Sequence, residues 1–353
     1  MPVTQAQLLA GASYQLESYA SGDPIDQFST DRPFARWLIA NKEDSVFGNG
    51  IYNEKVRFTN DSNYQNYTGD DEVDYNRKDT VKLAKFQHYE AHDGFALNET
   101  ELANNGVIIT DDKNAVLAEA EKIQIVNKLK EGYATLKDGF QENWDIEMLL
   151  DGQQSTKACP GLDLLVSTTP AVGVIGGLDA SLFPWWRNNV NLAIPSAATD
   201  ANYTAFLAEL EESWRACMTY GGTSPDYIMC GAAFLDYFRA AARSQVTINV
   251  SSGSNGVSID PATNELSFHG VKLVWNPTFE KLDTMLGAIT YPWTKRCYFL
   301  NKKHYRMRPF KGRWMQQRQP ERVYNRYTHF FATTSDYGCT LKKRNSMAVL
   351  SIA

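Results

Sequence analysis

Apolar residues recur at steps of three and four along one stretch of the first half of the chain, which predicts a helix with one inward-facing stripe. The stripe consists of Val126, Leu129, Tyr133, Leu136, Phe140, Trp144 and Met148. Thr110, Asp111 and Asp112 form a start signal and Gly152 a stop, so the helix is expected over 112–150. It would be roughly 58 Å long, whereas a compact chain of this size has a diameter of about 53 Å. This predicts a flat or elongated protein whose surfaces are completed by neighbours.

Two glycines within this stretch raise an alternative of two shorter helices. A break near Gly132 or Gly139 would be reasonable, because glycine costs about 1 kcal/mol relative to alanine inside a helix. The apolar stripe continues through both positions, which favours one unbroken helix.

A long hairpin is predicted before the helix. Alternating stretches at 56–58 and 73–83 flank the segment 59–71, which is rich in Asn, Asp, Ser, Tyr and Gly. This pattern is typical of two strands with a loose tip. A two-stranded hairpin is marginal by itself in water, and few aliphatic residues are present to bury either face. We therefore expect the hairpin to rest on another surface, that of another subunit.

The remaining segments predict a mixed architecture. Residues 1–47 have scattered apolar anchors and weak periodicity, which predicts an arm with helical turns near 4–10 and 33–40. Leu, Val, Thr, Pro and Gly replace charged residues over 157–180, which predicts a domain boundary near 152–160. The elements expected beyond it are helices at 199–219 and 231–244 and strands at 226–230, 256–260, 265–269, 271–275, 297–300, 304–307, 323–333 and 348–352. This order predicts an α+β fold with the strand-rich tail pairing beneath the long helix.

Composition describes an ordinary globular chain, with 353 residues of which 43% are hydrophobic and 22% charged. Mean hydropathy is negative, and no apolar run approaches the ~18 residues that a membrane span needs. The N-terminus lacks the basic start and long apolar core of a signal peptide. The five cysteines are scattered without a CxxC pair, which predicts reduced thiols in a cytosolic product.

Charge is distributed unevenly along the chain. Net charge is −6, which argues against a protein that coats DNA. Segment 302–326 nevertheless holds nine Lys and Arg residues against one acid, whereas 54–112 is rich in acids. Opposite charge in separate blocks predicts docking between subunits, where complementarity sets the register. The alternative is a solvated basic strand face.

Residues 174–189, VIGGLDASLFPWWRNN, resemble a stretch of the major capsid proteins of tailed bacteriophages with the HK97-type fold. The order of elements is similar to that family over nearly the whole chain, and SFHGVKLVWNP at 267–277 resembles its axial-domain strand pair. The domains that this resemblance implies are an N-terminal arm (1–47), an extended loop or E-loop (48–95), a peripheral or P domain (96–155, spine helix 112–150), an axial or A domain (156–293) and returning P-domain strands (294–353).

The same resemblance implies a function. The chain would be a structural protein of the virion that self-assembles, in the host cytoplasm, as hexamers and pentamers of an icosahedral shell around phage double-stranded DNA. Implied partners are other copies of the chain, a portal, a decoration protein and non-specifically bound DNA. Many relatives carry a scaffolding segment before the arm; this sequence has no room for one, which implies a separate scaffolding protein or none.

Two other functions stay open from the sequence. An encapsulin-like nanocompartment shell would have the same fold and enclose an enzyme. A soluble hydrolase or sugar-binding protein, from a different class, would use the abundant Tyr and Trp as stacking platforms.

Candidate interface residues come from one aromatic cluster and two basic sets. Adjacent Trp185 and Trp186 on a strand would point to opposite sides, so one is expected in the core and the other against a partner or an arginine such as Arg187. Trp and Arg are enriched at interface hot spots; the alternative is that both tryptophans pack within the A domain. The candidate inter-subunit charge contacts are Arg57, Arg77 and Lys85 on the E-loop and Arg306, Arg308 and Arg313 on the tail.

Sequence motifs for chemistry are absent: there is no GxxxxGK[ST], GxSxG or HExxH. His88 and His92 are four apart in an extended region, about 13 Å distant, and so cannot chelate one metal. Asp145 and Glu147 point to different faces of the long helix, which predicts solvated charges or inter-subunit salt bridges and no acid–base pair. The sequence therefore predicts neither an enzyme nor a cofactor or metal site.

Overall fold

The computed structural model describes residues 30–45, 50–98, 100, 119–219, 223–245, 257–259, 266–320 and 328–353. By internal contacts the chain divides into 1–31 and 32–353, and the elements below all belong to the second unit. The helical turns predicted near 4–10 and the first seven residues of the predicted long helix lie outside the described residues.

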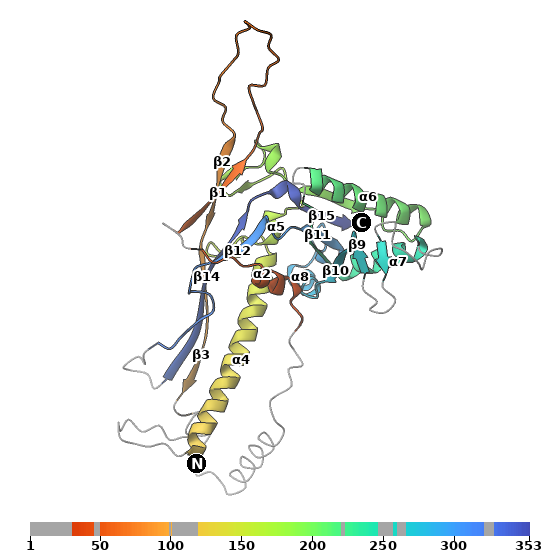
Figure 1. Cartoon of the computed structure of the whole chain (residues 1–353). Coiled ribbons are helices and arrows are strands. Elements are labelled where there is room, and N and C mark those ends of the chain that lie inside the picture. Colours follow the sequence, from red (N-terminus) through yellow and green to blue (C-terminus); the bar gives the residue numbers. More distant parts are fainter. Residues whose placement is uncertain are drawn as a thin grey trace. The chain divides into compact units, whose positions relative to one another are not determined.

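Helix α4, Glu119–Leu149, runs without a break through Gly132 and Gly139 (Figure 1). The single-helix prediction is therefore confirmed over the described residues, and the two-helix alternative is wrong. Its 31 residues span about 46 Å. The stripe residues that are buried, as the periodicity predicts, are Leu136, Phe140, Trp144 and Met148.

One antiparallel sheet accompanies α4. Its strands are β3 (Tyr89–Asn98), β12 (Tyr305–Pro309), β13 (Gln316–Arg318) and β14 (Thr328–Leu341). The central strand is β14, which pairs with β3 from Thr328↔Asn98 to Tyr337↔Tyr89. Trp144 of α4 meets Trp314 and Tyr337 with ring centroids 5.3 and 6.0 Å away. These aromatic contacts fasten the helix to the sheet.

The second sheet has seven strands. Their order is β6 (Asn189–Ile194), β15 (Ala348–Ile352), β11 (Arg296–Leu300), β7 (Tyr227–Cys230), β10 (Val271–Trp275), β9 (Leu266–Phe268) and β8 (Val257–Ile259). Helices α6, Asp200–Thr219, and α7, Ala232–Gln245, share one apolar cluster with it. The tail was expected to pair beneath the long helix, and this is wrong for β11 and β15. Both are buried along their whole length, because they lie inside the seven-stranded sheet.

A buried carboxylate on α4 joins three helices. The Asp145 side chain accepts hydrogen bonds from the Ala35 N–H at 3.0 Å and from the Thr278 hydroxyl at 2.7 Å. Ala35 lies in the first turn of α2, Pro33–Ala40, where backbone N–H groups lack partners within the helix. Thr278 begins α8, Thr278–Leu286. Asp145 therefore fixes α2 and α8 on α4.

Its neighbour Glu147 also bonds within the chain. One carboxylate oxygen accepts from the Cys159 N–H at 2.8 Å and from the Tyr337 hydroxyl at 3.2 Å. The expectation of solvated charges or inter-subunit salt bridges at Asp145 and Glu147 is wrong, since both carboxylates have partners inside the subunit.

Replacing Asp145 by alanine tests this junction. The Ala35 N–H and the Thr278 hydroxyl, on residues only 3% and 5% exposed, would lose their acceptor, and we expect the free energy of unfolding to fall by about 3 kcal/mol. Urea unfolding measures the change. Asp138→Ala, which removes an exposed acid from the same helix, is the control and should stay within about 0.5 kcal/mol of wild type. Equal effects at both positions would contradict a structural role for Asp145.

The two α4 glycines predict opposite effects of the same substitution. A Cβ at Gly132 would lie 2.8 Å from the ring of Phe95, whereas a Cβ at Gly139 would meet nothing within 4 Å. We expect Gly132→Ala to destabilise the fold by about 1–3 kcal/mol through overpacking. Gly139→Ala should instead stabilise it by up to about 1 kcal/mol. Thermal unfolding of both variants measures the signs, and a shift in the same direction would contradict the packing.

Candidate subunit interface

The predicted hairpin is present and rests on its own subunit. Strands β1, Ile51–Arg57, and β2, Val81–Gln87, pair antiparallel. The inner face of the hairpin buries Ala84 and Phe86, and the Lys85 N–H donates to the Gly176 carbonyl at 2.8 Å. The expectation that another subunit supports the hairpin is therefore wrong for these strands.

Gly176 explains part of the Gly-Gly signal in the sequence. Its φ is +61°, a region that favours glycine. A Cβ there would also lie 3.2 Å from Ala84 and Phe86. Glycine thus permits the close approach on which the root of the hairpin depends.

Beyond the strands, residues 58–80 continue as an ordered ribbon, although the sequence predicts a loose tip. Side-chain contacts cross it at regular intervals. The rungs are Lys78–Asp61 at 3.7 Å, Asn63 to the Asn76 carbonyl at 2.7 Å, Gln65–Asp74 at 2.9 Å and the Thr68 N–H to Asp71 at 2.9 Å. Each rung joins positions opposite one another in the β1–β2 register. The segment, named the ribbon from here on, therefore extends the hairpin.

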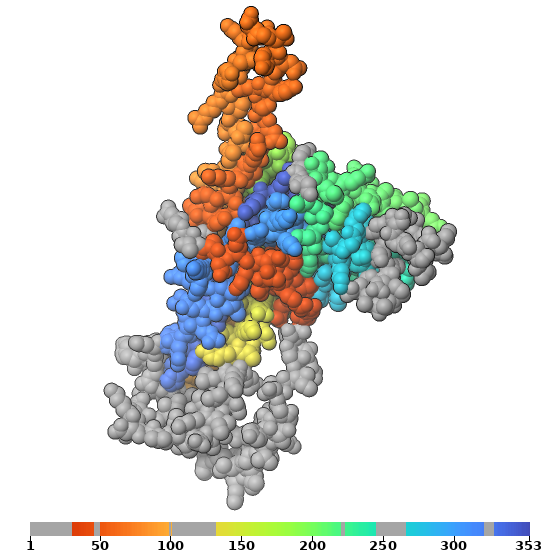
Figure 2. All heavy atoms as spheres, in the orientation of Figure 1, coloured from red at the N-terminus to blue at the C-terminus, as the bar shows by residue number. Residues whose placement is uncertain are grey.

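The ribbon displays aromatic rings and acids. Tyr64, Tyr67 and Tyr75 are 83%, 69% and 90% exposed. Six acidic residues face two basic ones over 58–80, a net charge of −4. Figure 2 shows the ribbon, in orange, standing clear of the other described residues on the face drawn. Exposed aromatic side chains in this number favour an interaction surface.

The three predicted E-loop cations are all exposed. Arg57 and Lys85 lie on the outward face of the hairpin, and Arg77 lies in the ribbon. In the described part of the chain no acidic side chain forms an ion pair with any of them. Their charges are thus available to a partner, and their role as inter-subunit contacts stays a prediction.

Sequence reasoning missed Lys55, which shares that outward face. It stands two residues before Arg57 and pairs across the hairpin with Leu83. The period of two along a strand was the signal that would have found it. The exposed Leu83 and Val174 carried no such signal, because an apolar residue in a strand pattern is normally assigned to the core.

The tryptophan pair lies on a 3-10 helix, η1 (Pro184–Trp186), and not on a strand. Trp186 is buried, and its indole N–H donates to the Ile175 carbonyl at 3.0 Å. Trp185 is half-buried and stacks on Phe58 with ring centroids 5.5 Å apart. Trp186 is therefore corrected from an interface candidate to a core residue, and Trp185 supports the root of the ribbon.

Arg187 is also used inside the subunit. Its guanidinium donates to the Ala180 carbonyl at 2.7 Å and to the Ser181 carbonyl at 2.9 Å. These two bonds hold the turn that follows β4, Val174–Ile175, and β5, Leu178–Asp179. The interface prediction for Arg187 is corrected accordingly, because its donors are turned toward its own backbone.

Arg308 is the centre of an intramolecular charge cluster. It is 2% exposed and lies 2.7 Å from Glu43 and 3.3 Å from Glu54, with its guanidinium over the ring of Tyr52. Arg306 bonds the same Glu43 carboxylate. Burial acts to raise the pKa of Glu43, but the two arginines outweigh it and hold that pKa below its ordinary value. The inter-subunit prediction for Arg306 and Arg308 is corrected, since their partners are in the same chain.

Arg313 is intermediate. Its side chain is 52% exposed and bonds Asp336 at 2.7 Å, while its guanidinium lies over Phe310. Part of the guanidinium still faces solvent, so the prediction of a contact with another subunit stays open there. The opposite-charge blocks of the sequence thus meet largely inside one subunit.

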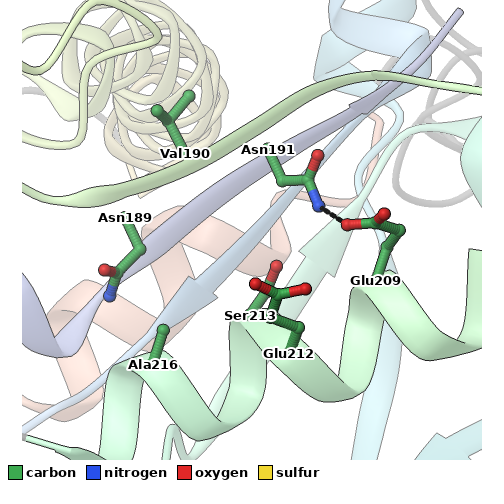
Figure 3. A pocket seen from close by; sticks show the side chains of 7 residues that line it. All are labelled: Asn189, Val190, Asn191, Glu209, Glu212, Ser213 and Ala216. Atoms are coloured by element: carbon green, nitrogen blue, oxygen red, sulfur yellow. Dashed lines mark hydrogen bonds between the residues drawn. The ribbon is translucent and has the colours of Figure 1, made fainter.

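A polar cleft of about 310 Å³ lies between β6 and α6. Figure 3 shows the Asn191 amide turned toward Glu209, to which it donates a hydrogen bond of 2.5 Å. The other residues around the cleft are Asn189, Val190, Glu212, Ser213 and Ala216. Its lining contains no histidine, cysteine or lysine, so Ser213 has no base there that would activate it.

Metal and membrane sites are limited to what the described residues show. Within them, no three His, Cys, Asp or Glu side chains gather closely enough to hold a metal ion. None of the helices in the same set is sufficiently long and apolar to span a bilayer.

No protein-family model and no curated protein matches the sequence, but solved structures match the fold. The capsid asymmetric unit of cyanophage A-1(L) aligns at TM-score 0.59 and 12% identity, covering 93% of this chain and 94% of that one. The capsid of cyanophage P-SCSP1u gives 0.56 and 10%, covering 94% and 91%. The capsid of Myoviridae phage XM1 gives 0.53 and 10%, covering 97% and 98%.

These likenesses extend over nearly the whole of both chains. The protein therefore has the α+β, HK97-like fold of bacteriophage capsid proteins, as the sequence resemblance implies.

Proposed function

We propose that this chain is the major capsid protein of a tailed bacteriophage, which self-assembles into the icosahedral shell that encloses the phage double-stranded DNA. The observation that carries the proposal is the alignment with phage capsid structures over more than 90% of this chain. The exposed ribbon supports it, because its tyrosines have no use in the fold of one subunit.

The ribbon suits a protein whose contacts are completed by neighbours. A tyrosine buries about 150–250 Å² when it is covered, so three tyrosines supply several hundred Å². One such contact is modest beside a stable two-partner interface of about 1,600 Å². A shell repeats the contact at every subunit, and many moderate interfaces then give a durable particle.

The remaining assignments belong to the same proposal. The chain acts as a structural protein and not as an enzyme, is located in the virion, and assembles in the host cytoplasm as hexamers and pentamers. Its partners are other copies of itself, a portal, a scaffolding protein, a decoration protein and non-specifically bound DNA.

Expression of the full chain tests the proposal. Size-exclusion chromatography followed by negative-stain microscopy should give megadalton material and closed shells. A stable monomer near 39.7 kDa would contradict it, and hydrolytic turnover or sugar binding by that monomer would favour the soluble alternative. Nuclease-protected DNA in native particles, with portal and terminase genes nearby, separates a capsid from an encapsulin-like shell that holds an enzyme.

A further inference from the structure

A small apolar groove lies beside the root of the ribbon. It has a volume of about 200 Å³ and lies between β2, the start of β3 and residues 160–176. Pro160, Leu164 and Val174 contribute apolar walls, and Lys85 and Gln87 also line it. Cofactor and drug pockets are usually about 300–1,000 Å³, so this groove suits a single inserted side chain.

The surface next to the groove is basic and aliphatic. The outward face of the hairpin carries the cross-strand pairs Asn53↔Lys85, Lys55↔Leu83 and Arg57↔Val81. Three cations thus lie together on a face without an acidic residue. Leu83 and Val174 are 48% and 62% exposed, which is unusual for aliphatic side chains unless a partner covers them.

The tip of the ribbon has the complementary chemistry. Tyr67 stands next to the turn at Gly69, and the exposed Asp70 and Glu72 follow it. Neither acid forms an ion pair with any described residue. An aromatic ring beside two free carboxylates matches an apolar groove beside free cations, and such complementarity sets both partner and register.

The tip does not reach the groove of its own chain. The four rungs keep the ribbon extended. The twelve residues from Arg57 to Gly69 therefore carry the tip about 40 Å past the end of the strands. Folding back would break the rungs, so the groove that receives the tip belongs to another molecule.

We propose that the acidic, tyrosine-bearing tip of the ribbon docks into the groove beside β2 on a second copy of this chain. The inference rests on the proposed shell function and names the receiving surface. Because tip and groove are different surfaces, each copy gives one contact and receives another. Contacts of this heterologous kind close into rings when the rotation between copies allows it.

Disulfide trapping tests the contact directly. Val174→Cys is combined in turn with Tyr64→Cys, Tyr67→Cys or Tyr75→Cys in the full chain, and assembled material is oxidised and run on a non-reducing gel. All five native cysteines are buried, so the introduced thiols react first. We expect at least one pair to give a ladder of multiples of the monomer mass, while each single substitution stays mainly monomeric.

The outcomes separate this inference from the shell function. Wild-type shells with no ladder from any of the three pairs would overturn the docking site and leave the shell function standing. Absence of wild-type shells would overturn the shell function itself. A crosslink that stays within one chain, visible as a monomer of altered mobility, would also overturn the inference.

Charge exchange gives an independent readout. K55E/K85E and D70K/E72K are each expected to lower shell yield at least tenfold, since both place like charges at the contact. The chain carrying all four substitutions should recover to within about twofold of wild type, because complementarity is restored with reversed sign. K55R/K85R is the matched control and should assemble normally. A four-substitution chain that assembles no better than either pair would refute the contact.

Discussion

Arg308→Glu is expected to prevent stable folding, with a loss of about 3–5 kcal/mol in the free energy of unfolding. The substitution places a third carboxylate beside Glu43 and the buried Glu54. Lys342, 3.8 Å from Glu54, is then the cation left to that side chain among its described ion pairs. Whole domains are stable by only about 5–15 kcal/mol, so the loss removes much of the total.

Soluble yield and urea unfolding of the unassembled chain measure this effect. Arg313→Glu is the matched control, because that side chain is half-exposed and has one acidic partner; exposed pairs contribute about 0–1 kcal/mol. The sequence alone predicts that Arg308→Glu blocks assembly more than folding. Observing a soluble R308E chain with wild-type unfolding and no shells would restore that prediction and refute the role of the buried cluster.

The elements that the sequence predicts well are those whose signal is local. The long helix, α6, α7 and the hairpin each follow from a periodicity of three to four or of two within one stretch. The continuity of α4 at Gly132 depends on less local chemistry, since the ring of Phe95 occupies the space that a side chain would fill. The stripe nevertheless predicted the outcome, because it runs through both glycines.

Strand partnership was the part of the fold that could not be predicted. β11 and β15 are buried along their whole length, so their sequences read alike whichever sheet receives them. The pairing of β14 with β3 joins residues more than 230 positions apart, as in Thr328↔Asn98. No pattern within either strand encodes such a partner.

The candidate site divides in the same way. Exposure of Arg57, Arg77 and Lys85 follows from polar, strand-and-turn surroundings and was predicted. Burial of Arg308 was not, because its partner Glu54 stands 254 residues away. A cation in a basic block appears solvated until the fold brings acids to it.

Excision of the ribbon is expected to abolish shell assembly while the subunit still folds. Phe58 donates its N–H to the Thr80 carbonyl at 3.1 Å, which makes these two residues suitable flanks for a two-residue turn. Replacing 59–79 by Asn-Gly provides the type I′ turn that such hairpins prefer. The four rungs removed are all internal to the ribbon, and the shorter loop lowers the closure entropy by up to about 2 kcal/mol.

The melting temperature of the excised chain should therefore equal or exceed that of wild type, whereas microscopy should show no closed shells. A full-length chain with Tyr64, Tyr67 and Tyr75 each changed to Ser separates reach from chemistry. It retains the ribbon and its backbone, so a matching loss of shells would place the assembly energy in the three rings. Normal shells from the excised chain would mean that the exposed tyrosines serve no contact between copies, and the energy of assembly would then have to come from the faces of the two sheets.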